Sequence, residues 1–335
     1  MFTNRDRTLI IAEIGNNHEG DMGAAREMVD RAAETGVDVV KFQTFITEKF
    51  TSPVDPARIA RLKQFQLSFD DFAELAERAR AKGLMFFSTP LDLESARFLA
   101  TIVDAIKIAS GDNTFWPLIE CCADSGKPMI ISTGISGQDE IQEAVSRVNG
   151  RWAAGNIAGE LALLHCIVSY PAPPEQANLG AIASLKAAFP NQTIGYSDHT
   201  MGLDAAVAAV AMGARIVEKH FTLANDYSDF RDHQLSADPD DMATLVRRIR
   251  AVEDMTGDGQ LGTMACERDL VTPVRRSIAA GRDLAAGHVL AIDDIVWVRP
   301  GEGIPPGREN EVLNRRLNRD VTQGDLIQFG HLEEM

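Results

Sequence analysis

Two histidines lie where they could share a metal ion. His199 ends one expected strand, and His220 lies near the end of the next. The carboxyl ends of neighbouring parallel strands meet at one edge, so the two imidazoles can converge on one ion. An isolated histidine is more often a satisfied polar residue, but Glu13 and Asp232 add carboxylates nearby. Two histidines without a cysteine predict an open octahedral sphere that suits Mn²⁺ or Mg²⁺.

Two lysines lie inside apolar runs. Lys41 occurs in VVKFQ and Lys107 in AIKIAS, where a buried ammonium group needs an anionic partner. One interpretation is a structural ion pair with Glu13 or Asp112. The other is a site for a substrate anion, completed by the hydroxyl groups of Thr89, Ser110, Ser132 and Ser197. Two cations with several small donors suit a phosphate and a carboxylate together.

The overall charge makes these lysines informative. The chain has 335 residues, a formal net charge of −16 and only eight lysines. No basic run is longer than a short pair such as Arg275-Arg276, which argues against a nucleic-acid or anionic-membrane surface. A substrate anion therefore requires a few cations that reverse the unfavourable field locally. Lys219 alternates with His220 and is expected to face the surrounding helices.

The composition indicates a globular protein of the cytoplasm. Hydrophobic residues make up 45% of the chain. No stretch approaches the roughly 20 apolar residues of a membrane span, and the first residues lack a signal-peptide pattern. The four cysteines have no zinc-ligand spacing and are expected to be free, buried thiols.

Eight short apolar runs position the polar residues described above. They alternate with helix-like segments and comprise residues 9–15, 37–45, 83–90, 105–110, 128–134, 161–170, 193–199 and 215–222. Such alternation predicts a parallel sheet covered by helices, and eight repeats favour a closed (β/α)8 TIM barrel. An open doubly wound sheet is the alternative, but no dinucleotide-binding glycine pattern follows the first run. An extra loop or short helix is expected before the third run, around SPVDPARIA.

The organisation changes after the eighth repeat. We predict a catalytic barrel over residues 1–260, a linker over 261–272 and a small β-rich domain over 273–335. The last part contains an internal repeat, because 282–295 and 319–332 share Arg-Asp, a glycine and a later Leu or Ile. Each copy is expected to form a turn followed by a strand.

Strand ends are where a barrel of this kind performs its function. Alternation along the strands predicts that Lys41 shares a face with Gln43, Ser197 with His199, and Glu218 with His220. The remaining strand ends contribute Glu13, Thr89, Ser110, Asp112, Ser132 and Tyr170.

In order along nearly the whole chain, a series of segments resembles the sialic acid synthase family. The segments are AEIGNNHEGD (12–21), DVVKFQT (38–44), FFSTP (86–90), KIASGD (107–112), ISTG (131–134), LLHC with SYPAPPEQANL (163–179), IGYSDHT (194–200) and EKHFTL (218–223). VWVRPGEGIPP (296–306) resembles the antifreeze-like (SAF) domain that follows the barrel in these synthases.

The resemblance implies condensation of phosphoenolpyruvate with N-acetylmannosamine or a related N-acyl sugar aldehyde, with release of phosphate. A divalent metal would polarise the aldehyde. By motif, His199 and His220 resemble the metal ligands, and Glu13 resembles the carboxylate that activates water or transfers a proton. The residues that resemble phosphoenolpyruvate contacts are Lys41, Thr89, Lys107, Ser110, Ser132 and Ser197. Those that resemble sugar contacts are Gln43, Asp112, Tyr170, Asp232 and Arg299.

Arg299 matches an arginine that one subunit lends to the acyl-sugar pocket of the other. The resemblance therefore implies a domain-swapped homodimer. Three departures concern the sugar. Asp112 stands where bacterial members often have Glu, and Ile167-Val168 replace a polar pair before the Tyr-Pro. The segment 225–239 is more charged than the loop of the family, so Asp232 aligns less securely than the barrel motifs.

Three other functions remain as alternatives: a synthase with a different sugar, an aldolase, and a binding role for the last domain. A synthase for legionaminate or pseudaminate would use a 2,4-diacetamido-trideoxy hexose by the same mechanism. A Schiff-base aldolase would use Lys41 or Lys107 as its nucleophile. A carbohydrate- or ice-binding role for 273–335 would need a flat threonine-rich face, and Thr322 is the only threonine there.

Overall fold

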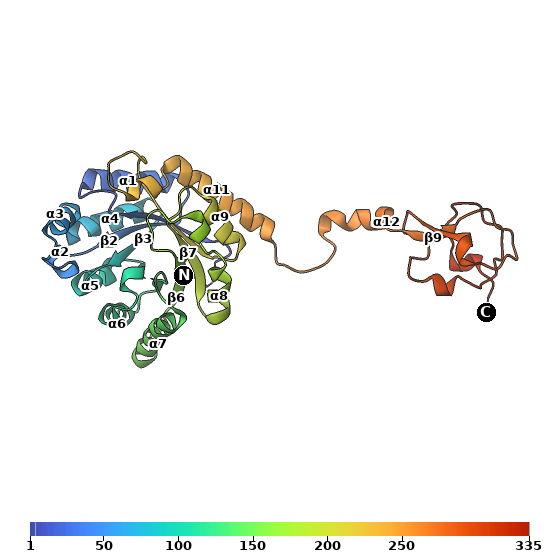
Figure 1. Cartoon of the computed structure of the whole chain (residues 1–335), viewed down its shortest axis with the longest axis horizontal. Coiled ribbons are helices and arrows are strands. Elements are labelled where there is room, and N and C mark those ends of the chain that lie inside the picture. The colour runs from blue at the N-terminus through green and yellow to red at the C-terminus, as the bar shows by residue number, and fades with distance from the viewer. Residues whose placement is uncertain (4, 335) are drawn as a thin grey trace. The chain divides into compact units, whose positions relative to one another are not determined.

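The computed structural model describes residues 1–3 and 5–334 and divides the chain into two units, Met1–Gly257 and Asp258–Met335. In the first unit eight parallel strands close into a barrel in sequence order (Figure 1). They are β1 (Leu9–Gly15), β2 (Val39–Thr44), β3 (Met85–Pro90), β4 (Ala105–Ile108), β5 (Met129–Ser132), β6 (Leu161–Cys166), β7 (Thr193–Asp198) and β8 (Ile216–His220). Each apolar run forms one strand, so the predicted TIM barrel is confirmed and the open sheet is wrong.

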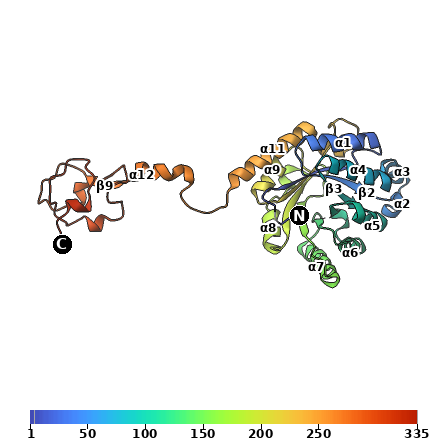
Figure 2. The same cartoon turned by 180° about the vertical axis from the view of Figure 1, so that it is seen from behind.

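Helices surround the strands when the unit is viewed from either side (Figures 1 and 2). They are α1 (Met22–Glu34), α2 (Thr47–Phe50), α3 (Pro56–Phe65), α4 (Phe69–Ala81), α5 (Leu93–Ile102), α6 (Trp116–Asp124), α7 (Gln138–Gly155), α8 (Ala181–Ala188), α9 (Asp204–Ala211), α10 (Asp232–Leu235) and α11 (Pro239–Thr256). The Asp21 side chain caps α1, and a Ser68–Asp71 capping box begins α4. The extra segment expected before the third strand forms α2 and α3.

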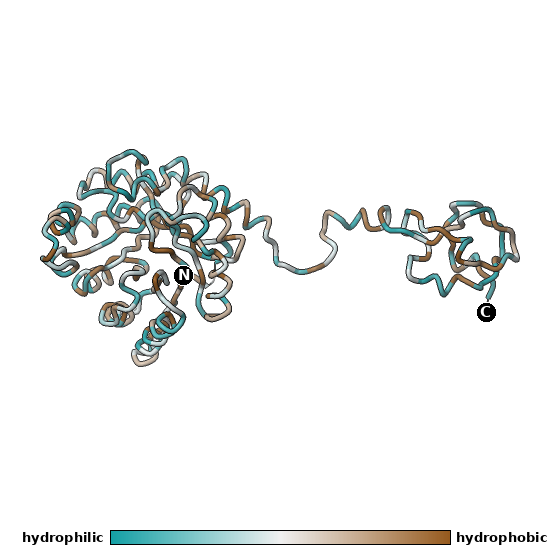
Figure 3. Tube along the Cα trace, in the orientation of Figure 1, coloured by the Kyte–Doolittle hydropathy of each residue, from teal (hydrophilic) through white to brown (hydrophobic). Residues whose placement is uncertain are grey.

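The barrel interior is apolar at the amino ends of the strands and polar at their carboxyl ends. Leu9 and Ile11 of β1 point inward, as do Val39 of β2 and Ile216 of β8, and they form a buried cluster beneath the site. Their neighbours of opposite parity pack against the helices. The apolar strands are visible as brown segments of the trace in Figure 3. Because the period is two, the next inward positions of these strands are the charged residues described below.

The second unit contains a short antiparallel pair, β9 (Ser277–Ala280) and β10 (Ile295–Val298), preceded by α12 (Val271–Val274). The predicted repeat forms two equivalent turns that hold each other. Leu284 and Val321 exchange backbone hydrogen bonds, and Asp283 and Asp320 each accept one from the backbone of the other turn. The strand expected within each copy of the repeat is wrong, because isolated bridges and a 3-10 turn follow each turn there, and β10 begins only at Ile295, where the first copy ends.

Two expectations from composition can be compared with the structure. All four cysteines are free thiols, as predicted, but Cys266 is exposed and Cys121 is half-buried, so their expected burial is partly wrong. Among residues 1–3 and 5–334, no helix has both the length and the apolar character needed to cross a membrane.

Candidate active site

Four charged side chains form a buried cluster inside the barrel. Lys41 Nζ lies 2.7 Å from Glu13 Oε2 and 3.7 Å from Glu218 Oε2. Lys107 Nζ lies 3.2 Å from Glu218 Oε1. Each of the four side chains is at most 5% exposed, so the charges are compensated almost entirely by one another. Glu13 and Lys41 are register partners on β1 and β2.

The pKa values of the two carboxyl groups, Glu13 and Glu218, are shifted in opposite directions. Burial alone would raise the pKa of Glu218, but Lys107 and Lys41 outweigh it and hold that pKa at about 2. Burial is the largest influence on Glu13 and raises its pKa despite the opposing effect of Lys41. For Lys41, burial is outweighed by Glu13 and Glu218, so its pKa is raised. Glu13 is therefore the carboxyl in this cluster that is better suited to hold a proton.

Hydroxyl groups complete the walls around this cluster. Thr89 Oγ1 accepts a hydrogen bond from Lys41 Nζ at 3.2 Å, and Ser197 Oγ donates to Glu218 Oε1 at 3.0 Å. Ser110 Oγ accepts from the backbone N–H of Gly134 at 3.1 Å. Ser132 Oγ is buried without a protein partner. These groups line a cavity of about 90 Å³, which we term the inner cavity.

Gly134 allows the wall of the inner cavity to close. A Cβ atom at this position would lie 2.7 Å from both Ser110 Oγ and Val168 Cγ2, so any other residue would force these side chains to shift. The Asn113 side-chain amide donates to the carbonyl groups of Ser132 and Gly134 and holds this loop from the other side.

The two histidines face each other across the same cavity. The ring centroids of His199 and His220 lie 5.4 Å apart. His199 Nδ1 donates to the Ile167 carbonyl at 2.7 Å, which leaves Nε2 free to bind a metal. His220 Nδ1 is buried without a hydrogen-bond partner. Burial, His199 and Lys41 lower the pKa of His220 well below its usual value, so its imidazole is neutral at pH 7.

This donor set fits a loosely ligated divalent ion. Among residues 1–3 and 5–334, no group of three or more histidine, cysteine or acidic side chains is arranged to hold a metal. The imidazoles of His199 and His220 would thus be the protein ligands, with water or substrate oxygen completing the sphere. The unpartnered Nδ1 of His220 is the observation that supports the fit.

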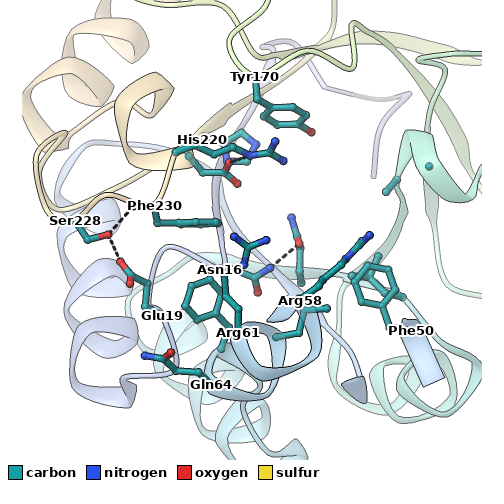
Figure 4. A pocket seen from close by; sticks show the side chains of 18 of the residues that line it. Asn16, Glu19, Phe50, Arg58, Arg61, Gln64, Tyr170, His220, Ser228 and Phe230 are labelled. Atoms are coloured by element: carbon teal, nitrogen blue, oxygen red, sulfur yellow. Dashed lines mark hydrogen bonds and ion pairs between the residues drawn. The ribbon is translucent and has the colours of Figure 1, made fainter. Parts of the chain in front are cut away.

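A larger cleft of about 1020 Å³ adjoins the inner cavity, and we term it the outer cleft. Gln43, Tyr170 and His220 line both spaces. Figure 4 shows Tyr170 and His220 in the outer cleft. Gln43 connects them, because its side chain donates to Glu13 Oε1 at 3.3 Å and accepts from Asn16 at 2.9 Å.

Acidic and aromatic side chains of the outer cleft could contact a polyhydroxylated ligand. Asp112 lines it, and burial raises the pKa of this carboxyl to about 6. Asp232 also lines it and pairs with Arg231 at 3.3 Å, and the Arg231 guanidinium lies 5.0 Å from the centre of the Tyr170 ring.

The barrel brings nearly all of the predicted site residues to these two spaces. The inner cavity is lined by Glu13, Lys41, Gln43, Thr89, Lys107, Ser110, Ser132, Tyr170, Ser197, His199 and His220, and the outer cleft adds Asp112 and Asp232. Arg299 lies in the second unit with its side chain exposed. Val168 also lines the inner cavity.

Two features of the buried cluster differ from the prediction: Glu218 was not predicted as a site residue, and the partner expected for Lys107 was wrong. Lys41 pairs with Glu13, one of the two expected partners, but Lys107 pairs with Glu218 and with neither Glu13 nor Asp112. The signal for Glu218 was present, because it alternates with His220 inside a strand and must point inward. Lys219 bonds to Asp198 Oδ2 at 3.0 Å and to the Thr200 carbonyl, which confirms its structural role outside the barrel interior.

Comparison with known proteins identifies relatives over nearly the whole chain. The NeuB family matches residues 28–261 and the SAF domain matches residues 275–333. An uncharacterized protein of Methanocaldococcus jannaschii is 45% identical over 97% of this chain and 94% of its own length. N,N'-diacetyllegionaminic acid synthase of Legionella pneumophila is 36% identical over 97% of this chain and 94% of its own. The crystal structure of N-acetylneuraminic acid synthetase from Leptospira borgpetersenii is 35% identical, covers 79% of this chain and 90% of its own, and superposes with a TM-score of 0.74.

Proposed function

This chain belongs to the NeuB family, and from that membership we propose that it condenses phosphoenolpyruvate with N-acetylmannosamine or a related N-acyl sugar aldehyde. The products are N-acetylneuraminate or a related nonulosonic acid and phosphate. The observation that supports this best is the pair of adjoining spaces. A small cavity with Lys41 and Lys107 suits an anion, and a wide cleft with Asp112 and Asp232 suits a sugar.

The inner cavity is assigned to phosphoenolpyruvate. Lys41 and Lys107 bind its phosphate and carboxylate, and the hydroxyls of Ser110 and Ser132 donate to the remaining oxygens. Ser132 Oγ has no protein partner and is free to do so. Burial of the cluster keeps bulk water away from the methylene carbon that forms the new bond.

Glu13 is assigned the proton transfer. Its Oε2 lies beside Lys41, its pKa is raised by burial, and it lines the inner cavity close to both proposed substrates. After carbon–carbon bond formation, Glu13 accepts the proton of the water that adds to the cationic carbon. Gln43 donates to the other Glu13 oxygen and holds the carboxylate in this orientation.

His199 and His220 would hold a divalent metal, Mn²⁺ or Mg²⁺. Bound there, it would supply Lewis-acid polarisation of the sugar aldehyde. The protein's part is to orient both imidazoles, and the Ile167 carbonyl does this for His199 by accepting a hydrogen bond from Nδ1.

The apolar side chain of Val168 supports a second candidate for the acceptor sugar. Val168 lines the inner cavity where the family usually places a polar side chain, so one hydrogen-bond donor to phosphoenolpyruvate or the sugar is absent. This favours a legionaminate or pseudaminate synthase if the donor served the sugar, because a 2,4-diacetamido-trideoxy hexose has fewer hydroxyl groups than N-acetylmannosamine. The similarity to the Legionella pneumophila protein supports the same acceptor. A Schiff-base aldolase is disfavoured, because Lys41 is held charged by two carboxylates and a nucleophilic lysine must be neutral.

One labelling experiment tests the reaction itself. Phosphoenolpyruvate that contains ¹⁸O in its bridging position is incubated with the protein, Mn²⁺ and each acceptor in turn. We expect released phosphate to carry the label, because the carbon–oxygen bond breaks, together with a nonulosonic acid detected by mass spectrometry. Unlabelled phosphate, or no release with any acceptor, contradicts the proposal.

The proposal also includes a homodimer in which Arg299 of the second unit reaches the partner's sugar pocket. Light scattering should give twice the chain mass of 36.5 kDa, and Arg299→Ala should raise the Michaelis constant for the sugar while leaving that for phosphoenolpyruvate unchanged. A monomer that is fully active would contradict this arrangement. The cytoplasmic location expected from the sequence stays a prediction.

A further inference from the structure

Two arginines of the outer cleft have no role in the scheme above. Arg58 and Arg61 belong to α3 and are separated by one helical turn, so their side chains lie next to each other. In Figure 4 they lie on the wall of the cleft across from Tyr170 and His220. Both are exposed to the cleft.

Neither arginine has a carboxylate partner in the described part of the chain, although acidic residues exceed basic ones by 16. The contrast within α3 is direct, because Lys63 of the same helix pairs with Glu48 at 2.5 Å. Nor do the arginines compensate Asp112, whose pKa is raised by burial with no cation opposing it.

Aromatic side chains lie on the same wall of the cleft, and one of them contacts Arg58. Arg58 lies 5.7 Å from the centre of the Phe50 ring. Phe65 and Phe230 stack edge to face at 5.1 Å and form part of a small apolar cluster that lines the cleft. The outer cleft therefore combines an apolar wall with two adjacent forked donors that are not used by the protein.

From these contacts we infer that Arg58 and Arg61 form a second binding site for a phosphomonoester dianion, separate from the inner cavity. Two neighbouring guanidinium groups present the paired donors that phosphate oxygens accept, and each remains charged at any working pH. In a chain of net charge −16, an uncompensated pair at this position reverses the field locally.

Two phosphomonoesters could occupy the site, and the inference rests on the proposed function for both. One is an acceptor sugar phosphorylated at the end opposite its aldehyde, since His220 and the arginines lie on opposite walls. The other is phosphoenolpyruvate on its way through the outer cleft to the inner cavity.

The test compares the full-length protein with Arg58→Gln/Arg61→Gln. The matched control is Arg97→Gln/Arg247→Gln, which removes two other exposed arginines without ion pairs, on α5 and α11, and changes the net charge equally. Glutamine keeps the helix propensity of each position. Initial rates are measured with N-acetylmannosamine and with its 6-phosphate, at varied phosphoenolpyruvate and ionic strength.

If the acceptor phosphate is the ligand, the wild type prefers the 6-phosphate. The Arg58/Arg61 variant then loses roughly 100-fold in kcat/KM for it and keeps its rate with the neutral sugar, since two charge-assisted contacts are removed. If phosphoenolpyruvate is the ligand, kcat/KM for phosphoenolpyruvate falls with both acceptors, kcat is kept, and the salt dependence weakens.

The site is overturned if the Arg58/Arg61 variant matches the control variant in all of these constants. That result is distinct from failure of the proposed function, in which no acceptor, phosphorylated or neutral, gives phosphate release with the wild-type protein.

Discussion

Replacement of Lys107 by Met tests the buried charge cluster most directly. The substitution roughly keeps the side-chain length and removes the cation that lies 3.2 Å from Glu218 Oε1. Breaking a buried ion pair costs about 3–5 kcal/mol when the partner is left alone. Glu218 keeps Lys41 at 3.7 Å and the Ser197 hydroxyl at 3.0 Å, so we expect a loss at the lower end of this range, about 3 kcal/mol of unfolding free energy at pH 7.

The same substitution should also weaken the binding of phosphoenolpyruvate. Lys107 is one of two cations in the inner cavity, and a hydrogen bond to a charged group contributes about 1.5–3 kcal/mol. The Michaelis constant for phosphoenolpyruvate should therefore rise about 10- to 100-fold. That for the sugar should change little, because Lys107 does not line the outer cleft. Steady-state kinetics and denaturant unfolding measure the two effects separately.

The pH dependence of the stability loss follows from Glu218. The depressed pKa of Glu218, about 2, contributes stability that is present above the ordinary value of 4.5 and is lost as the pH falls toward 2. Without Lys107 this depression is smaller. The difference in unfolding free energy between the wild type and the variant should therefore be full above about pH 4.5 and shrink on acidification.

Lys219→Met is the matched control, because Lys219 is equally buried but pairs with Asp198 outside the barrel interior. It should lower stability while leaving the Michaelis constant for phosphoenolpyruvate within about twofold. If Lys107→Met binds phosphoenolpyruvate as well as the wild type, or if both variants raise the constant equally, the assignment of the inner cavity is refuted.

Three further predictions concern the metal, the Asp112 carboxyl group that is proposed to contact the sugar, and the choice of sugar. Protein purified without chelator should contain a divalent metal that His199→Ala/His220→Ala lacks, and equal metal content by elemental analysis would contradict ligation. Burial raises the pKa of Asp112 to about 6. The contribution of this carboxyl to the stability of the folded protein is therefore fully present below its ordinary pKa of 3.8 and is lost as the pH rises through 6. Asp112→Asn should therefore raise the unfolding free energy at pH 8 by about 1 kcal/mol, after discounting for partial exposure, and have no effect below pH 3.8; a loss of stability at pH 8 would refute this. Val168→Asn should shift the ratio of kcat/KM between N-acetylmannosamine and a 2,4-diacetamido-trideoxy hexose toward the former by about tenfold, and an unchanged ratio would remove Val168 as a specificity determinant.

The sequence predicted the barrel and most of the site for one physical reason. Strand alternation has a period of two, so an apolar run with inward Leu9 and Ile11 must also direct Glu13 inward. The same count directs Lys41 and Lys107 into the interior. What alternation does not provide is distance across the barrel, which depends on strand stagger. Lys107 pairs with Glu218 and not with Asp112, and this pairing could not be predicted because it depends on such a distance.

Other features depend on segments outside the strand order. Arg58 and Arg61 lie on α3, part of an insertion whose placement over the cleft is not determined by the period of any strand. In the second unit the repeat predicted the two turns, because Gly287 and Gly324 adopt positive φ angles that suit a turn. It did not predict that single bridges replace strands, since a short pairing is decided by tertiary contacts.

The charge count connects the lysines to the histidines. The buried cluster contains two cations and two carboxylates, so it is close to neutral before substrate binds. Phosphoenolpyruvate would bring a phosphate and a carboxylate, roughly three negative charges, into a low-dielectric cavity of an acidic protein. The two lysines cannot compensate this negative charge alone, because Glu13 and Glu218 already neutralise them. Because Glu13 must stay free to accept a proton from water, the additional positive charge would come from a divalent ion at the two histidines. The histidine pair and the lysine pair are thus two halves of one electrostatic requirement, and each should bind its ligand more tightly when the other is occupied.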